Sequence, residues 1–115
     1  MTTDVIDPAT FAELQDSAGA EFVAELVGTF LEEAPQMLSE LRLALATGQE
    51  EHFRRAAHSL KSNCNTFGAL GLGTMAREFE LRGLAADSAL DAAALDALDA
   101  AYVQAAAALK GRAHG

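Results

Sequence analysis

Apolar residues recur every three or four positions over most of the chain, which is the spacing that places them on one face of an α-helix. This repeat, with the residues that can begin and end helices, predicts five helices over approximately residues 8–16, 20–46, 49–66, 70–84 and 89–110. The connections are a few residues long, so consecutive helices should run antiparallel. The sequence therefore predicts an all-α fold, an antiparallel up-down four-helix bundle with a short additional N-terminal helix.

The predicted helix over residues 20–46 has a continuous apolar face but contains a proline. An interior proline removes a backbone hydrogen bond and clashes with the preceding turn, so Pro35 should cause a kink or a break near Glu32. Because the apolar repeat keeps its phase through Pro35, we favour one kinked helix over two separate helices. The face consists of Val23, Val27, Phe30, Ala34, Met37, Leu41 and Ala44, widened by Phe22, Leu26, Leu38 and Leu45.

Residues that commonly begin and end helices support these boundaries. Asp7 is a capping residue, and Pro8 takes the first helical position. A backbone N–H at that position would have no acceptor within the helix, so proline loses no hydrogen bond there. Gly48 is placed to end the second helix in a left-handed conformation. Ser88 with Asp91 forms a capping pattern for the last helix.

The predicted helix over residues 49–66 places one histidine on the side away from its apolar face. At roughly 100° per residue, His58 lies about 140° from the centre of that face and should point into solvent. The face is formed by Phe53, Ala57, Leu60, Cys64 and Phe67. The polar residues on the flank of the histidine are Arg54, Arg55, Lys61, Ser62 and Asn65. An exposed imidazole among cations and small polar groups is a suitable place to hold a phosphate.

The run His58-Ser59-Leu60-Lys61-Ser62, followed by Gly68, resembles the signature of the histidine-containing phosphotransfer (HPt) family, which reads roughly His-x-Leu-Lys-Gly with a further glycine downstream. Ser62 departs from the pattern by a hydroxymethyl group. The helix pattern fits the family over roughly residues 5–110. The resemblance implies a helical bundle that carries a phosphoryl group on its histidine between receiver domains of two-component phosphorelays.

The resemblance assigns phosphoryl acceptance to Nε2 of His58. An imidazole suits this role because its ordinary pKa, about 6.5, leaves it mostly neutral and nucleophilic near neutral pH. The nearby cations should disfavour the imidazolium further and then favour the dianionic phosphoryl product. Lys61 is one turn away and is expected to stabilise the phosphoryl group, whereas Gly68 is expected to end the helix. We expect partner docking to involve Arg54, Arg55, Ser62 and Asn65.

Composition and charge limit the partners. The 115 residues fit a single domain over residues 1–115, and a formal net charge of −9 argues against nucleic acid or an anionic membrane surface as the main partner. No apolar run approaches the roughly 20 residues that span a bilayer, and the acidic, polar N-terminus does not resemble a secretory signal. With one cysteine, Cys64, we expect a reduced, cytoplasmic protein, and we expect a monomer.

The sequence offers no cofactor site of its own. His52, His58 and Cys64 point to different sides of one helix and cannot share a metal ion, and His114 lies in a tail. No phosphate-binding loop or kinase signature occurs, so we expect a covalent phosphohistidine carrier without autokinase activity. Phosphoryl transfer usually needs Mg²⁺, which a partner receiver domain would have to supply.

Two other interpretations remain open. The domain could be a non-phosphorylated helical docking module that binds receiver domains or kinases through the same face. It could also be a structural bundle, in which His58 is an exposed histidine without function and the basic residues form a solvated surface.

Overall fold

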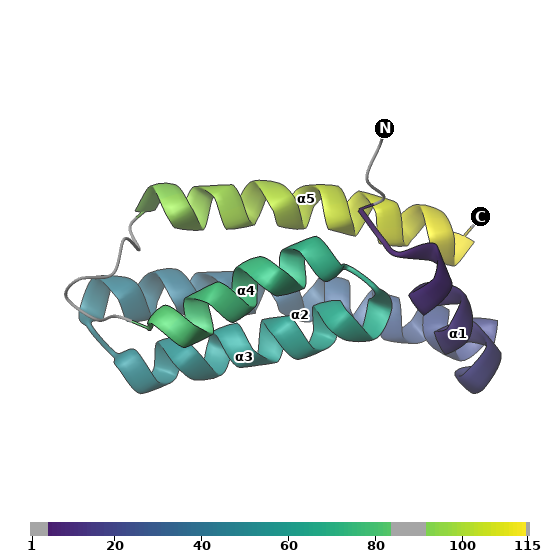
Figure 1. Cartoon of the computed structure of the whole chain (residues 1–115), viewed down its shortest axis with the longest axis horizontal. Helices are drawn as coiled ribbons and strands as arrows, with labels where there is room; N and C mark the ends of the chain where they lie inside the picture. The colour runs from purple at the N-terminus through teal and green to yellow at the C-terminus, as the bar shows by residue number, and fades with distance from the viewer. Residues whose placement is uncertain (1–4, 84–91, 115) are drawn as a thin grey trace.

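The computed structural model describes residues 5–83 and 92–114. Within these ranges the chain forms five α-helices and no strand, which confirms the all-α prediction (Figure 1). The helices are α1 (Pro8–Ala18), α2 (Ala20–Thr47), α3 (Glu50–Phe67), α4 (Leu70–Arg82) and α5 (Ala92–His114).

The four longer helices form the predicted bundle. Successive helices from α2 to α5 alternate in direction, and α1 crosses one end of the bundle against α2 and α3 (Figure 1). Helix α3 packs between α2 and α4, while α5 packs against α2 and, less extensively, against α4. The outer face of α3 therefore remains open to solvent.

The apolar faces predicted from the sequence form one core. All five apolar positions of α3 are at most 3% exposed. The centre of the α2 face is buried, while Leu26, Met37, Leu38 and Leu45 are partly buried. Phe22 is the exception to the prediction, because its side chain is 52% exposed. It lies about 100° around α2 from Val23, so it leaves the packed face when Val23 occupies the centre of that face.

The helix boundaries follow local backbone chemistry. The Asp7 carboxylate accepts hydrogen bonds from the backbone N–H and the hydroxyl of Thr10, at 3.0 and 2.6 Å, and caps α1 as predicted. Helix α2 is continuous through Pro35, so the prediction of one helix rather than two was correct. Gly48 ends this helix with a φ of 69°, in the left-handed region.

Helices α1, α4 and α5 differ from their predicted bounds, and α1 continues to Ala18, two residues beyond the predicted end. Helix α4 ends at Arg82, two residues early, because Gly83 turns the backbone to a φ of 58° while its N–H still bonds to the Phe79 carbonyl. Helix α5 continues to His114, beyond the predicted end at residue 110, so His114 belongs to the helix. The predicted cap at Ser88 and Asp91 lies outside the described residues.

Gly68 joins the end of α3 to the N-terminal segment. Its φ is 85°, and its carbonyl accepts a hydrogen bond of 2.8 Å from the backbone N–H of Asp7. A Cβ atom at this position would lie 3.0 Å from the Asp7 carbonyl oxygen, so both the conformation and the close contact require glycine. Gly68 thus ends the helix as predicted, and it also anchors the start of α1.

None of the helices in the described ranges is both long enough and apolar enough to cross a membrane.

Candidate functional site

His58 lies near the middle of α3 and faces away from the core. Its side chain is 58% exposed, while Ala57 and Leu60 beside it are fully buried. The amphipathic pattern of α3 thus fixes the imidazole on the outer surface of the bundle, as the spacing predicts.

A carboxylate from the next helix holds the ring. The Nδ1 atom of His58 lies 2.8 Å from Oε2 of Glu80, and Nζ of Lys61 donates a hydrogen bond of 2.8 Å to Oε1 of the same side chain. Glu80 therefore joins the two residues that the sequence motif singles out. It is an acidic residue of α4 that the sequence pattern did not identify.

The Glu80 contact fixes the state of the imidazole. The pKa of Glu80 is lowered chiefly by the hydrogen bond from Lys61 and further by His58, against an opposing effect of partial burial. An ionised carboxylate can only accept hydrogen bonds, so Nδ1 must carry the proton in this contact. In the neutral ring Nε2 is then unprotonated, and its lone pair is available.

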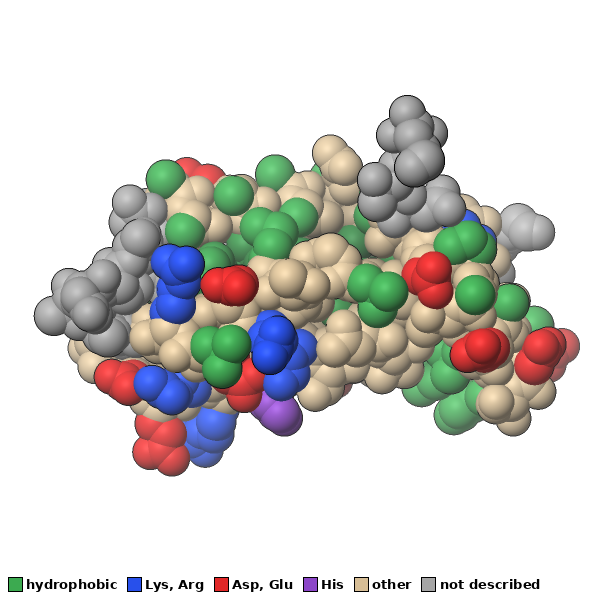
Figure 2. All heavy atoms as spheres, in the orientation of Figure 1, with side chains coloured by type: hydrophobic (Ala, Val, Ile, Leu, Met, Phe, Trp, Pro, Cys, Tyr) green, Lys and Arg blue, Asp and Glu red, His purple; other side chains and the backbone are tan. Residues whose placement is uncertain are grey.

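The sequence predicted cations and small polar groups around His58, and it did not predict the acidic side chains that also lie there. The ring is in hydrogen-bond contact with an anion, and basic and acidic side chains lie side by side over α3 and α4 (Figure 2). The Glu80 contact was missed because the helical repeat of α3 describes neighbours on the same helix and gives no information about the side chains of α4.

The guanidinium of Arg54 contacts Glu50 on α3 and lies against Gly83 at the end of α4. One guanidinium nitrogen lies 3.1 Å from Oε1 of Glu50, one turn earlier on α3. The same group covers the end of α4, since a Cβ atom built on Gly83 would lie 2.8 Å from Nε of Arg54. Arg54 still borders the hollow beside the imidazole, which is lined by Glu51, Arg54, Arg55, His58, Ser59 and Glu80.

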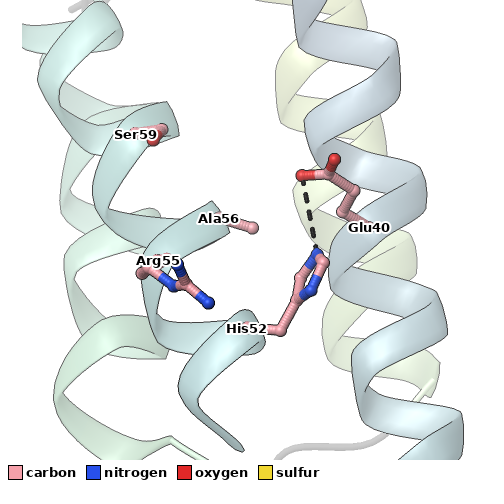
Figure 3. A pocket seen from close by; sticks show the side chains of 5 residues that line it. All are labelled: Glu40, His52, Arg55, Ala56 and Ser59. Carbon is pink, nitrogen blue, oxygen red and sulfur yellow. Dashed lines mark ion pairs between the residues drawn. The ribbon is translucent and has the colours of Figure 1, made fainter. Parts of the chain in front are cut away.

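Arg55 links this hollow to a second one between α2 and α3. The second hollow is lined by Glu40, His52, Arg55, Ala56 and Ser59 (Figure 3). There Nε2 of His52 lies 3.9 Å from Oε2 of Glu40, so the imidazole of His52 faces α2. The two hollows share Arg55 and Ser59 and therefore adjoin each other on the surface of α3.

Ser62 and Asn65 are both exposed but differ in their contacts. Ser62 is exposed, and its carbonyl accepts a hydrogen bond of 2.9 Å from the Thr66 hydroxyl. Asn65 packs against α4, where its Oδ1 atom occupies the space that a Cβ atom at Gly73 would need. Ser62 is therefore available to a partner beside His58, while Asn65 contributes to the close approach of α3 and α4.

Cys64 lies in the core below this surface. The side chain is fully buried, and burial raises the pKa of its thiol to about 12. It is therefore neither a thiolate nucleophile nor a ready metal ligand at neutral pH. In the described part of the chain, no three His, Cys, Asp or Glu side chains come together in an arrangement that could hold a metal ion.

Comparison with known protein families gives one match. The family model of the Hpt domain matches residues 25–108, a region that extends from α2 to α5 and contains the complete His58 site. Comparisons with curated proteins and with solved structures found no match.

Proposed function

Because the chain belongs to the Hpt domain family, whose members are phosphohistidine carriers of two-component signalling, we propose that His58 accepts a phosphoryl group from one receiver domain and passes it to another. The observation that carries this proposal is the contact between Nδ1 of His58 and Glu80. It leaves the lone pair of Nε2 available on an imidazole that is 58% exposed.

The transfer is a displacement at phosphorus. Nε2 of His58 attacks the phosphoryl group of a receiver phospho-aspartate, and the P–O bond breaks with its electron pair remaining on the aspartate. The ring keeps its Nδ1 proton and becomes a phosphorylated imidazolium beside the Glu80 carboxylate. Onward transfer reverses these bond changes towards a second receiver. The receiver supplies Mg²⁺ to neutralise phosphoryl charge, so the carrier needs neither a cofactor of its own nor kinase activity.

Lys61 is suited to stabilise the transferring group. Its ammonium is held by Glu80, which also contacts the ring, and its side chain is 23% exposed. The phosphoryl oxygens add negative charge on the same side of α3, and an ammonium held nearby favours that charge. Lys61 would share its hydrogen bonds between Glu80 and the phosphoryl oxygens during transfer.

The receiver would dock over the exposed flank of α3. The small side chain of Ser62 leaves room for a partner next to His58. Arg54 and Arg55 border the hollow beside the ring. An acidic receiver pocket fits a surface that presents these cations. Asn65 is the weakest of the proposed docking residues, because it packs against Gly73.

The competing function is a docking module that binds receivers without being phosphorylated. Intact-mass measurement at neutral or alkaline pH, after mixing the domain with a phosphorylated receiver, separates the two functions. A mass increase of one phosphoryl group that depends on His58 supports the carrier. Receiver binding without any mass increase would support the docking module instead.

A further inference from the structure

We propose that Glu80 keeps the phosphorylated imidazole of His58 protonated at Nδ1, and thereby keeps the phosphoryl group ready for onward transfer. The inference rests on the proposed phosphorylation of His58 and concerns the state that follows it. In this proposal Glu80 is a positioning residue. It acts through His58 and affects the lifetime of the phosphorylated form.

The protonation state of Nδ1 determines the charge of the imidazole leaving group when the P–N bond breaks. When Nδ1 carries a proton, the bond breaks with its electron pair returning to Nε2, and the leaving group is a neutral imidazole. When Nδ1 has lost its proton, the same break would produce an imidazolate anion, which is a much poorer leaving group. Transfer to an aspartate or to water is therefore faster from the protonated form, and the pKa of the phosphorylated ring sets the pH at which this form is lost.

The charges around the ring show which residue controls that pKa. On α3 the hollow beside His58 presents Glu51, Arg54 and Arg55, and on α4 it presents Glu80. Lys61 is linked to the ring through Glu80, to which its ammonium is hydrogen-bonded. The arginines and Lys61 disfavour a cationic ring, whereas the two glutamates favour it.

Glu80 has the strongest effect because of its geometry. Its Oε2 atom is 2.8 Å from Nδ1, which is hydrogen-bond distance to the atom whose proton is in question. Its other oxygen is occupied by Lys61, so the carboxylate is held in place and kept ionised. The contact is made before phosphorylation and needs no rearrangement afterwards, since the phosphoryl group is attached to the opposite nitrogen.

The test removes the negative charge of Glu80 and keeps the size and shape of its side chain. Glu80→Gln should lower the pKa of the phosphorylated ring by roughly 0.5 to 1 pH unit, because the site is partly exposed and the full effect of a buried pair is not reached. At neutral pH the phosphorylated variant should then survive about three to ten times longer than the parent. Lys61→Met should raise the same pKa, because it removes a cation and frees the Glu80 carboxylate for the ring.

Phosphoramidate is the phosphoryl donor for this experiment, so no receiver is needed. The pKa is measured by following the ³¹P resonance of the phosphorylated protein against pH, and the lifetime by the loss of that resonance. Glu78→Gln is the matched control, because Glu78 is an exposed glutamate of the same helix that pairs with Arg82. It should leave both values at those of the parent, and circular dichroism should show that all variants are folded.

The outcomes separate this inference from the proposed function. Opposite shifts of the pKa in Glu80→Gln and Lys61→Met, with no shift in Glu78→Gln, would support the role of Glu80. A parent that is phosphorylated on His58, with the same pKa in Glu80→Gln, would overturn this role and leave the carrier function intact. A parent that phosphoramidate does not phosphorylate on His58 would overturn both.

Discussion

Nδ1 of His58 and Oε2 of Glu80 lie 2.8 Å apart, although the two residues belong to different helices. The contact joins the exposed face of α3 to α4 and defines which imidazole nitrogen is free. The same carboxylate holds Lys61, so one acidic residue organises both conspicuous residues of the sequence motif.

Replacing Lys61 should slow transfer more than it weakens docking. In Lys61→Ala, the ammonium that favours the transferring phosphoryl charge is lost, while the proposed docking residues Arg54, Arg55 and Ser62 are kept. We expect the transfer rate at saturating receiver to fall about tenfold, which corresponds to roughly 1.4 kcal/mol. Rapid-quench measurement of phosphotransfer gives this rate. Equal rates for Lys61→Ala and the parent would show that the lysine is not used in the transfer step.

Position 62 should accept only small side chains. Ser62→Gly should transfer as fast as the parent or faster, at a helix cost of roughly 0.5 kcal/mol. Ser62→Leu should fold normally, because the side chain points into solvent, but it should block the approach of a receiver. The measurements are the transfer rate from a labelled receiver and the thermal melt of each variant. Normal melting combined with parental transfer in Ser62→Leu would contradict docking over this flank.

Stability should depend on pH through Glu80. The pKa of Glu80 is lower in the folded protein than its ordinary value, so the favourable contacts are present above that ordinary value and disappear as the pH falls through the folded-state pKa. Glu80→Gln should therefore reduce the free energy of unfolding at pH 7 by less than about 1 kcal/mol, since the side chain is partly exposed. Urea titrations should show this difference shrinking towards low pH. A difference that grows as the pH falls below the ordinary pKa of a glutamate would contradict the assigned contacts.

Two glycines of α4 should respond differently to alanine. No atom lies within 4 Å of the position that a Cβ atom would take at Gly71, so Gly71→Ala should stabilise the protein by roughly 0.5 to 1 kcal/mol through helix propensity. Gly73→Ala would force the Asn65 side chain to move, which should offset that gain. Thermal melts of the two variants provide the comparison. A gain at Gly73 as large as that at Gly71 would show that α3 and α4 do not need the close contact.

The periodicity of a single helix was sufficient to predict much of this structure. The face of α3 that runs from Phe53 to Phe67 is buried as its spacing indicates, and the same spacing places His58 in solvent. Asp7 and Gly48 mark helix ends because their chemistry acts locally. These features depend on residues close together in the sequence, where backbone geometry alone determines the outcome.

Contacts between helices were not predictable in this way. Glu80 looks like any other solvated acidic residue of α4, and its approach to His58 depends on the rotation of α4 against α3. Gly73 contributes to that approach by leaving room for Asn65. The exposure of Phe22 was missed for a related reason, because the width of an apolar face does not reveal how much of it neighbouring helices cover.

The most direct test of the proposed phosphoryl acceptor compares two histidines of the same helix. His58→Gln and His52→Gln each remove one imidazole from α3, and neither should change the helical content measured by circular dichroism. Each protein is mixed with a phosphorylated receiver and analysed by intact-mass spectrometry at neutral or alkaline pH. We predict that the parent and His52→Gln gain one phosphoryl group and that His58→Gln gains none. A phosphoryl group retained in a folded His58→Gln protein would contradict the assignment of His58 as the acceptor.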